Sequence, residues 1–276
     1  MKILLAADLH YDLRKFDWVV EAAPHVDLVV LAGDLLDRAS LVDRPAQAVV
    51  AQKYFRKIRE RKRLLVCSGN HDLDVRDANG ELTARWMGKT RRLDVPGDGD
   101  SLVMENCRFT ILPWWDGDVG RDWISAHLAE EAALRPANWI WVIHVPPSES
   151  PVGWAGDKCF GADEVRRWIE DYQPDMVFSG HVHQAPFIKD GSWADRIGKS
   201  WCFNAGFQLG PYPSCIVIDT DERIAYWVSL AGLEQLSLDA PAERPYTPVH
   251  QPPDWLIAMA RGEAPLAERS PLPVGG

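Results

Sequence analysis

The sequence predicts an α/β domain whose strands form a mixed sheet or two stacked sheets, covered by helices. Three observations lead to this fold class. Short apolar runs rich in β-branched residues recur along the chain, helical patterns lie between them, and two further segments have the pattern of antiparallel hairpins. Apolar runs of this length are typical of strands buried on both faces, and strands that alternate with helices indicate a layered α/β architecture.

The expected strands and helices alternate from the first residues onward. The strands are expected at residues 3–7, 28–32, 64–67, 139–143 and 175–178. The helices are predicted from apolar residues that share one helical face. These stripes are Leu13, Phe16 and Val20; Ala46, Val50, Tyr54 and Ile58; Ile124, Leu128 and Ala132; and Val165, Trp168, Ile169 and Tyr172. The hairpins are expected at residues 101–112 and 214–230.

We expect one domain over residues 1–230, followed by a tail over residues 231–276. The chain has 276 residues, which is enough for one large domain with a buried core. From residue 231 onward prolines cluster and the alternation of strands and helices stops. The tail is therefore expected to pack on the domain or to be partly disordered.

Charge and composition narrow the class of partner and the compartment. The formal net charge of -10 argues against tight binding to long nucleic acid, although a metal site could still attract a small phosphorylated substrate. The five Cys residues include no Cys-x-x-Cys pair, which favours a reducing compartment. No run is long and apolar enough to span a membrane, and the N-terminal apolar run is too short for a signal peptide. We expect a cytoplasmic protein.

Asp, Asn or His residues follow each of the five expected strands. In open α/β sheets, sites form outside the carboxyl ends of the strands, so these residues are expected to meet. The segments are Asp8-Leu9-His10, Gly33-Asp34-Leu35-Leu36-Asp37, Ser68-Gly69-Asn70-His71-Asp72, His144 and Gly180-His181-Val182-His183.

Taken singly, most of these segments have ordinary structural explanations. Asp8-Leu9-His10 could be a cap beside a hydrogen-bonded histidine, Asn70 could begin an Asx turn, and His144 could be a core residue. The segment from Gly180 to His183 is more specific, because alternate positions of an extended chain point to one side. The occurrence of such residues at five strand ends makes coincidence a poor explanation.

The residue types are those of a transition-metal site. Carboxylate, amide oxygen and imidazole together suit Mn, Fe or Zn, and thiolates are absent from the segments. The number of candidates fits two divalent ions held roughly 3.5–4 Å apart, as in two-metal hydrolysis. The seven candidate ligands are Asp8, His10, Asp34, Asn70, His144, His181 and His183.

The order of these motifs resembles the calcineurin-like metallophosphoesterase superfamily, over most of residues 1–230. The resemblance implies a four-layer αββα sandwich of two mixed sheets flanked by helices. It also implies two groups of metal ligands that share Asp34. The first metal would be held by Asp8, His10, Asp34 and His183, and the second by Asp34, Asn70, His144 and His181.

The resemblance gives three further residues a role at the site. His71 would bind phosphate and act as general acid for the leaving oxygen, and Asp37 would be its partner. Asn70, His71 and Arg38 would contact substrate. Arg38 is followed by Ala39, where the protein phosphatase branch often has Gly, so the substrate of that branch is not implied.

The expected reaction is hydrolysis of a phosphoester by a metal-bound hydroxide, most simply a phosphodiesterase acting on a small or nucleotide substrate. The two positive ions would lower the pKa of a bound water and stabilise charge in the transition state. A DNA or RNA nuclease, a phosphomonoesterase or protein phosphatase of the same superfamily, and a non-catalytic scaffold with this fold remain alternatives. The sequence does not indicate the oligomeric state.

Overall fold

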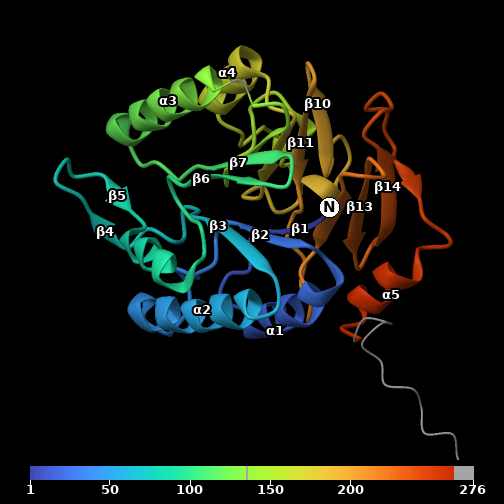
Figure 1. Ribbon diagram of the computed structural model, residues 1–276, viewed down its shortest axis with the longest axis horizontal. Helices are drawn as coiled ribbons and strands as arrows, with labels where there is room; N and C mark the ends of the chain where they lie inside the picture. The colour runs from blue at the N-terminus through green and yellow to red at the C-terminus, as the bar shows by residue number, and fades with distance from the viewer. Residues whose placement is uncertain (135, 264–276) are drawn as a thin grey trace, which may run out of the picture.

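The computed structural model describes residues 1–134 and 136–263, and it confirms the four-layer αββα sandwich. Two sheets stack face to face at the centre of Figure 1. One pair of helices, α1 and α2, covers the outer face of the first sheet, and the other pair, α3 and α4, covers the outer face of the second.

The first sheet has seven strands in the order β15-β14-β13-β12-β1-β2-β3. Its strands β1, β2 and β3 are parallel, and the others are added antiparallel, so the sheet is mixed. The strands are β1 (Lys2–Ala6), β2 (Leu28–Ala32), β3 (Arg63–Cys67), β12 (Cys215–Asp219), β13 (Ile224–Ser229), β14 (Gly232–Ser237) and β15 (Thr247–Pro248).

The second sheet has six strands in the order β10-β11-β9-β8-β7-β6. Its four inner strands are parallel, and β6 and β10 pair antiparallel at the two edges. The strands are β6 (Ser101–Met104), β7 (Cys107–Ile111), β8 (Trp139–Val142), β9 (Met176–Ser179), β10 (Ala194–Ile197) and β11 (Ser200–Asn204).

The four expected helices are confirmed as α1 (Leu13–Ala22), α2 (Arg44–Arg59), α3 (Asp118–Ala133) and α4 (Asp163–Tyr172). Four 3₁₀ segments join the larger elements: η1 (Ala23–His25), η2 (Arg85–Leu93), η3 (Pro151–Gly153) and η4 (Ala185–Phe187). Because β1 and β2 are buried on both faces, alternate residues contribute to different cores. Leu4 packs toward α1 and α2, whereas Ile3 and Leu5 pack between the sheets against Phe109 and Phe178.

A small hairpin of β4 (Val75–Arg76) and β5 (Leu82–Thr83) projects from the sandwich, at the left of Figure 1. Hydrogen bonds join this hairpin to the first turn of α3. Glu81 accepts hydrogen bonds from the backbone N–H groups of Val119 and Gly120, at 2.7 and 2.9 Å. A carboxylate at this position also interacts favourably with the positive end of the helix dipole.

The first sheet continues past residue 230, where the tail was expected to begin. Residues 232–237 form β14, which pairs with β13 along its whole length, so the expected boundary falls inside a hairpin. The chain then reaches α5 (Asp254–Ala260), whose last residue accepts a hydrogen bond from the indole of Trp18 at 3.2 Å. Residues 264–276 of the expected tail lie outside the described residues. Within the described part of the chain, none of the helices has the length and apolar character that crossing a membrane requires.

Candidate metal centre

The loops after β1, β2, β3, β8 and β9 meet at one end of the sandwich. Backbone hydrogen bonds join them in pairs: Asp8 N donates to Gly33 O at 3.0 Å, and Gly180 N donates to His144 O at 2.9 Å. Side chains join them further, because Asp34 Oδ1 accepts from His71 N at 2.8 Å. The structure therefore brings together segments that lie far apart in the sequence, as parallel strands with adjacent carboxyl ends require.

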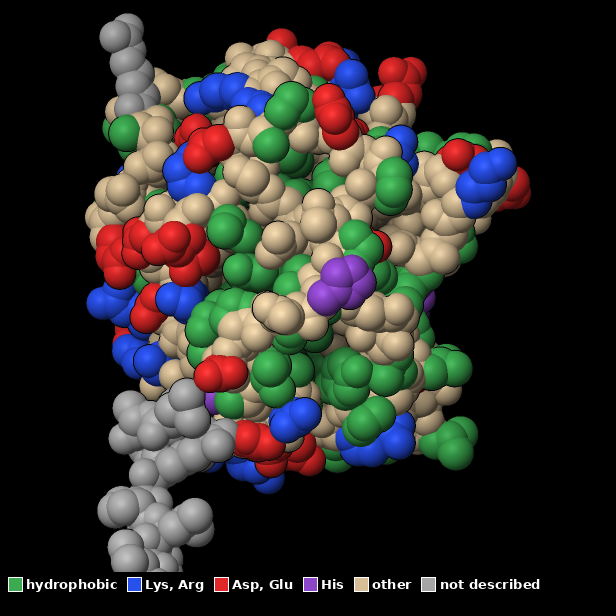
Figure 2. Space-filling view, turned by 90° about the vertical axis from the view of Figure 1, so that its right-hand side faces the viewer, with side chains coloured by type: hydrophobic (Ala, Val, Ile, Leu, Met, Phe, Trp, Pro, Cys, Tyr) green, Lys and Arg blue, Asp and Glu red, His purple; other side chains and the backbone are tan. Residues whose placement is uncertain are grey.

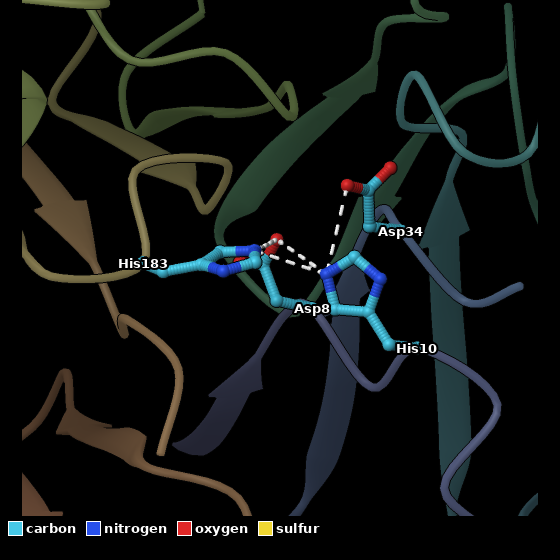
Figure 3. A group of neighbouring side chains, drawn as sticks. All are labelled: Asp8, His10, Asp34 and His183. Atoms are coloured by element: carbon cyan, nitrogen blue, oxygen red, sulfur yellow. Dashed lines mark hydrogen bonds and ion pairs between the residues drawn. The ribbon is translucent and has the colours of Figure 1, made fainter. Parts of the chain in front are cut away.

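The first ligand group consists of Asp8, His10, Asp34 and His183, and each residue places one donor atom within 4.8 Å of the others. Figure 3 shows both imidazoles and both carboxylates directed toward a common centre. His183 Nε2 lies 3.2 Å from Asp8 Oδ1, and His10 Nε2 lies 3.9 Å from Asp34 Oδ2. The two Nε2 atoms are 3.0 Å apart, so two ring nitrogens face each other where a cation would fit.

The second ligand group consists of Asp34, Asn70, His144 and His181. Donor atoms of Asp34, His144 and His181 lie within 4.8 Å of one another, and Asn70 Oδ1 lies 3.0 Å from His181 Nδ1. His144 Nε2 is 3.2 Å from Asp34 Oδ2. Asp34 belongs to both groups, so its carboxylate would be available to either ion.

His144 provides the sharpest test of whether a metal fits. Its Nδ1 lies 2.7 Å from the carbonyl oxygen of Ala32, which only accepts, so Nδ1 carries a proton. Its Nε2 is buried and forms no hydrogen bond among the described residues, only ion-pair contacts, the closer of them with Asp34 Oδ2 at 3.2 Å. A metal-binding histidine commonly donates its other ring N–H to a carbonyl in this way. The residues present therefore fit a divalent ion.

The backbone at the site has an unusual conformation that the ligand positions require. Asp8, His10, Asp34 and His181 all have positive φ, between 46° and 69°. Such residues cost on the order of 1 kcal/mol or more and tend to occur at functional sites. Gly33 meets a different constraint, because a Cβ there would lie 2.5 Å from His144 Nδ1.

Electrostatic interactions distinguish the carboxylates from the histidines. Burial alone would raise the pKa of Asp8 and Asp34, but the nearby histidines outweigh burial and hold both values below the ordinary range. Burial would lower the pKa of His144, yet the charges of Asp34 and Asp8 raise it to about 9. Burial followed by repulsion from His144 lowers the pKa of His181 to about 4. The site therefore holds two ionised carboxylates ready for a cation.

The structure places His71 beside the first ligand group, with its ring centroid 4.6 Å from that of His10. The carboxylate of Asp37 is near both histidines, with donor atoms within 4.8 Å. However, the hydrogen bond to His71 Nδ1 comes from Arg38 N at 3.3 Å, and Asp37 Oδ1 accepts from Ala39 N at 2.8 Å. The expected pairing of Asp37 with His71 thus stays a prediction, with a backbone N–H as the observed partner.

Asp72 has no predicted role, yet it joins two of the loops. This carboxylate is buried and accepts hydrogen bonds from Leu35 N, Leu36 N and Gly69 N at 3.0, 2.9 and 2.8 Å. Burial, with repulsion from Asp34, raises its pKa to about 7. Its place at the end of the Gly69-Asn70-His71-Asp72 segment was the only sequence signal of this role.

Phe207 is a second residue that the sequence did not indicate. Its ring stacks on His183 with centroids 4.8 Å apart and meets the edge of His10 at 5.6 Å. The ammonium of the buried Lys15 lies 3.6 Å from the centre of the Phe207 ring. Phe207 therefore supports the imidazoles of the first ligand group from behind.

Comparisons with known proteins agree with this geometry. The sequence profile of the family described as "Calcineurin-like phosphoesterase" matches residues 1–185. None of the curated proteins matches the chain by sequence.

Solved structures share the fold at low sequence identity. TT1561 of Thermus thermophilus aligns with a TM-score of 0.54 at 16% identity, covering 86% of this chain and 98% of that one. A dimetal phosphatase from Danio rerio aligns with a TM-score of 0.52 at 11% identity, covering 87% and 99%. The purple acid phosphatase PPD1 from Lupinus luteus aligns with a TM-score of 0.53 at 13% identity, covering 96% of this chain and 56% of that one.

Proposed function

The chain belongs to the calcineurin-like phosphoesterase family, and on this premise we propose that it is a two-metal phosphodiesterase acting on a small or nucleotide substrate. Membership makes it a metal-dependent phosphoester hydrolase. The diester preference, the size of the substrate and the individual roles below are the proposal.

One observation supports the proposal most directly: two groups of ligands share the carboxylate of Asp34, and one of them presents a buried imidazole nitrogen that has no hydrogen-bond partner among the described residues. Asp8, His10, Asp34 and His183 would hold one ion, and Asp34, Asn70, His144 and His181 the other. When bound, such ions supply Lewis acidity, which activates water at neutral pH and neutralises phosphoryl oxygens.

His71 is suited to protonate the leaving oxygen. Its Nδ1 accepts a hydrogen bond from the N–H of Arg38, so the neutral ring carries its proton on Nε2. The ring is half-buried at the open edge of the first ligand group, where a substrate oxygen could reach it. A general acid placed in this way typically contributes about 10²–10⁴-fold in rate. Arg38 is exposed next to it and is proposed to contact the substrate, as are Asn70 and His71.

The surface charge supports a small substrate. The net charge is -10, and on the face shown in Figure 2 the Lys and Arg side chains of the described residues lie among Asp and Glu. A protein that follows a long nucleic acid needs a continuous basic surface to neutralise phosphates. Binding energy for this substrate would therefore come from the metal centre and its immediate surroundings.

The proposal can be tested with paired substrates and one variant. The Mn-, Fe- or Zn-loaded protein should hydrolyse bis(p-nitrophenyl) phosphate with a higher kcat/KM than p-nitrophenyl phosphate. Asp34→Ala should remove bound metal, measured by mass spectrometry of the elements, and lower kcat/KM by more than about 100-fold, because substitutions that only support a ligand already cost up to that much. Asp122→Ala, on an exposed part of α3, is the matched control. Faster hydrolysis of the monoester would refute the diester preference, and full turnover in Asp34→Ala would refute the site.

A further inference from the structure

An apolar groove lies beside the second ligand group, with Trp114 in its wall. It has a volume of about 410 Å³ and lies between the β4–β5 hairpin, the loop after β7 and the beginning of α3. This volume is within the range of about 300–1,000 Å³ typical of small-molecule sites. Its apolar lining includes Leu82, Pro113, Trp114, Trp115, Val119 and Trp123.

Trp114 forms a wall that the groove shares with the metal centre. Its ring centroid lies 5.1 Å from that of His181 and 5.7 Å from that of His144. Its backbone N–H donates to Ser68 Oγ at 3.0 Å, and Ser68 N donates to Asp98 Oδ1 at 2.8 Å. Ser68 immediately precedes the loop that carries Asn70, so the same loop positions a ligand and the wall of the groove.

The acidic side chains around the groove are already engaged by backbone groups. Asp116 Oδ2 accepts from Leu82 N at 2.9 Å, and Glu81 accepts from the first turn of α3. The Arg85 side chain is exposed, and the nearby Asp116 pairs with Arg76 at 3.9 Å instead. The groove therefore offers mainly ring faces, with the Arg85 cation at its edge.

The aromatic side chains are arranged to bind a flat group. Trp114 and Trp115 stack with centroids 6.0 Å apart and an interplanar angle of 26°, and both are half-buried. Trp123, which is 45% exposed, lies at the rim. Indole faces bind planar rings through stacking and do so for any base, because every base has a π-face.

We propose that this groove binds a planar aromatic group the size of a nucleobase, carried by the ester group that the substrate retains. The inference rests on the proposed phosphodiesterase function. The leaving oxygen belongs near His71, whose ring contacts His10 in the first ligand group. Trp114 instead contacts the histidines of the second ligand group, so the groove receives the other substituent of the phosphorus.

Two diesters with the same leaving group test the proposal. Thymidine 5′-(p-nitrophenyl) phosphate carries a base on its retained ester group, and methyl p-nitrophenyl phosphate does not. The ratio of kcat/KM for the first substrate to that for the second should exceed one in the wild type. Trp114→Ala should lower this ratio about 10- to 100-fold, which is the loss expected when stacking on one base is removed. Trp114→Phe should retain most of it, and Val103→Ala, exposed on β6 outside the groove, should leave it unchanged.

A binding measurement separates this inference from the proposed function. Calorimetric titration should show adenosine 5′-monophosphate binding more tightly than ribose 5-phosphate, with the difference abolished in Trp114→Ala. If neither diester is hydrolysed, the proposed phosphodiesterase function is refuted. The titration alone then shows whether the groove binds a planar aromatic group. Equal binding of the two phosphates, or an equal loss for both diesters in Trp114→Ala, would overturn the proposal. A wild-type dimer that Trp123→Ala converts to a monomer in sedimentation would also overturn it, since the groove would then be occupied by a second copy.

Discussion

The two ligand groups of the metal centre share Asp34 but differ in how the protein holds them. In the first group, the side chains of His10 and His183 are 14% and 39% exposed, and an aromatic ring, Phe207, supports them. In the second group, His144 is fully buried, and a backbone carbonyl fixes its tautomer. His144 is therefore held in place by the protein itself, whereas the imidazoles of the first group are partly exposed to solvent.

The largest expected effect comes from removing the fixed histidine. His144→Asn should reduce the metal content to one ion per chain or fewer and lower kcat/KM by more than about 100-fold. In the metal-free protein it should lower the free energy of unfolding by about 3 kcal/mol, because Asp34 loses a buried charged partner. His183→Asn should lower the metal-free stability by about 1 kcal/mol or less, since its ion pair with Asp8 is partly exposed. Equal losses for the two variants, measured by urea unfolding, would show that the groups do not differ.

The contrast between the two ligand groups also predicts that the stability of the metal-free protein depends on pH. Burial opposes the charge on His144, but Asp34 and Asp8 raise its pKa to about 9, above the ordinary value of about 6.5. The charged ring therefore stabilises the metal-free fold fully below pH of about 6.5, and this contribution disappears as the pH rises through about 9. The difference in unfolding free energy between the wild type and His144→Asn should shrink by about 3 kcal/mol over this range. If this difference in unfolding free energy did not change with pH, His144 would not carry a positive charge in the metal-free fold.

An intermediate effect is expected from the aromatic support of the first group. Phe207→Leu removes the ring that stacks on His183 and meets the edge of His10, and it keeps an apolar side chain at this position. We expect the affinity of the first ligand group for its metal to fall about tenfold, as for other residues that only orient a ligand. Phe187→Leu, whose ring packs on Trp227 instead, is the control. If the affinities for both metals fell to the same extent in Phe207→Leu, the ring would support the fold as a whole and not one ligand group.

These residues also show what could be predicted from the sequence. The strands that precede Asp8, Asp34 and His144 were predictable because buried strands have continuous apolar runs, and the αββα layers followed from the resemblance. Phe207 was not predictable, because stacking depends on a loop that returns from β11 to the first ligand group. Nor was the partner of His71 Nδ1, which is a backbone N–H that no side-chain pattern reveals.

The smallest expected effect tests the residue behind Phe207. Lys15 is buried, its ammonium lies 3.6 Å from the centre of the Phe207 ring, and burial lowers its pKa to about 8. Lys15→Met keeps the length and apolar character of the side chain but removes a positive charge close to Asp8. Repulsion of a metal ion by this charge is worth about 1 kcal/mol or less at the effective dielectric of a protein, so the affinity of the first ligand group should rise about two- to fivefold.

Lys15→Met also removes the cation–π interaction with Phe207, which stabilises the fold by about 0.5–2 kcal/mol, and relief of the buried charge offsets much of this effect. The free energy of unfolding should therefore change little, which metal titration and urea unfolding can establish together. Lys57→Met is the matched control. It removes another ammonium that lies over an aromatic ring, in the last turn of α2, and should leave metal affinity unchanged. A fall in metal affinity in Lys15→Met would mean that the ammonium holds Phe207 in place, and that its role at the first ligand group is positional and not electrostatic.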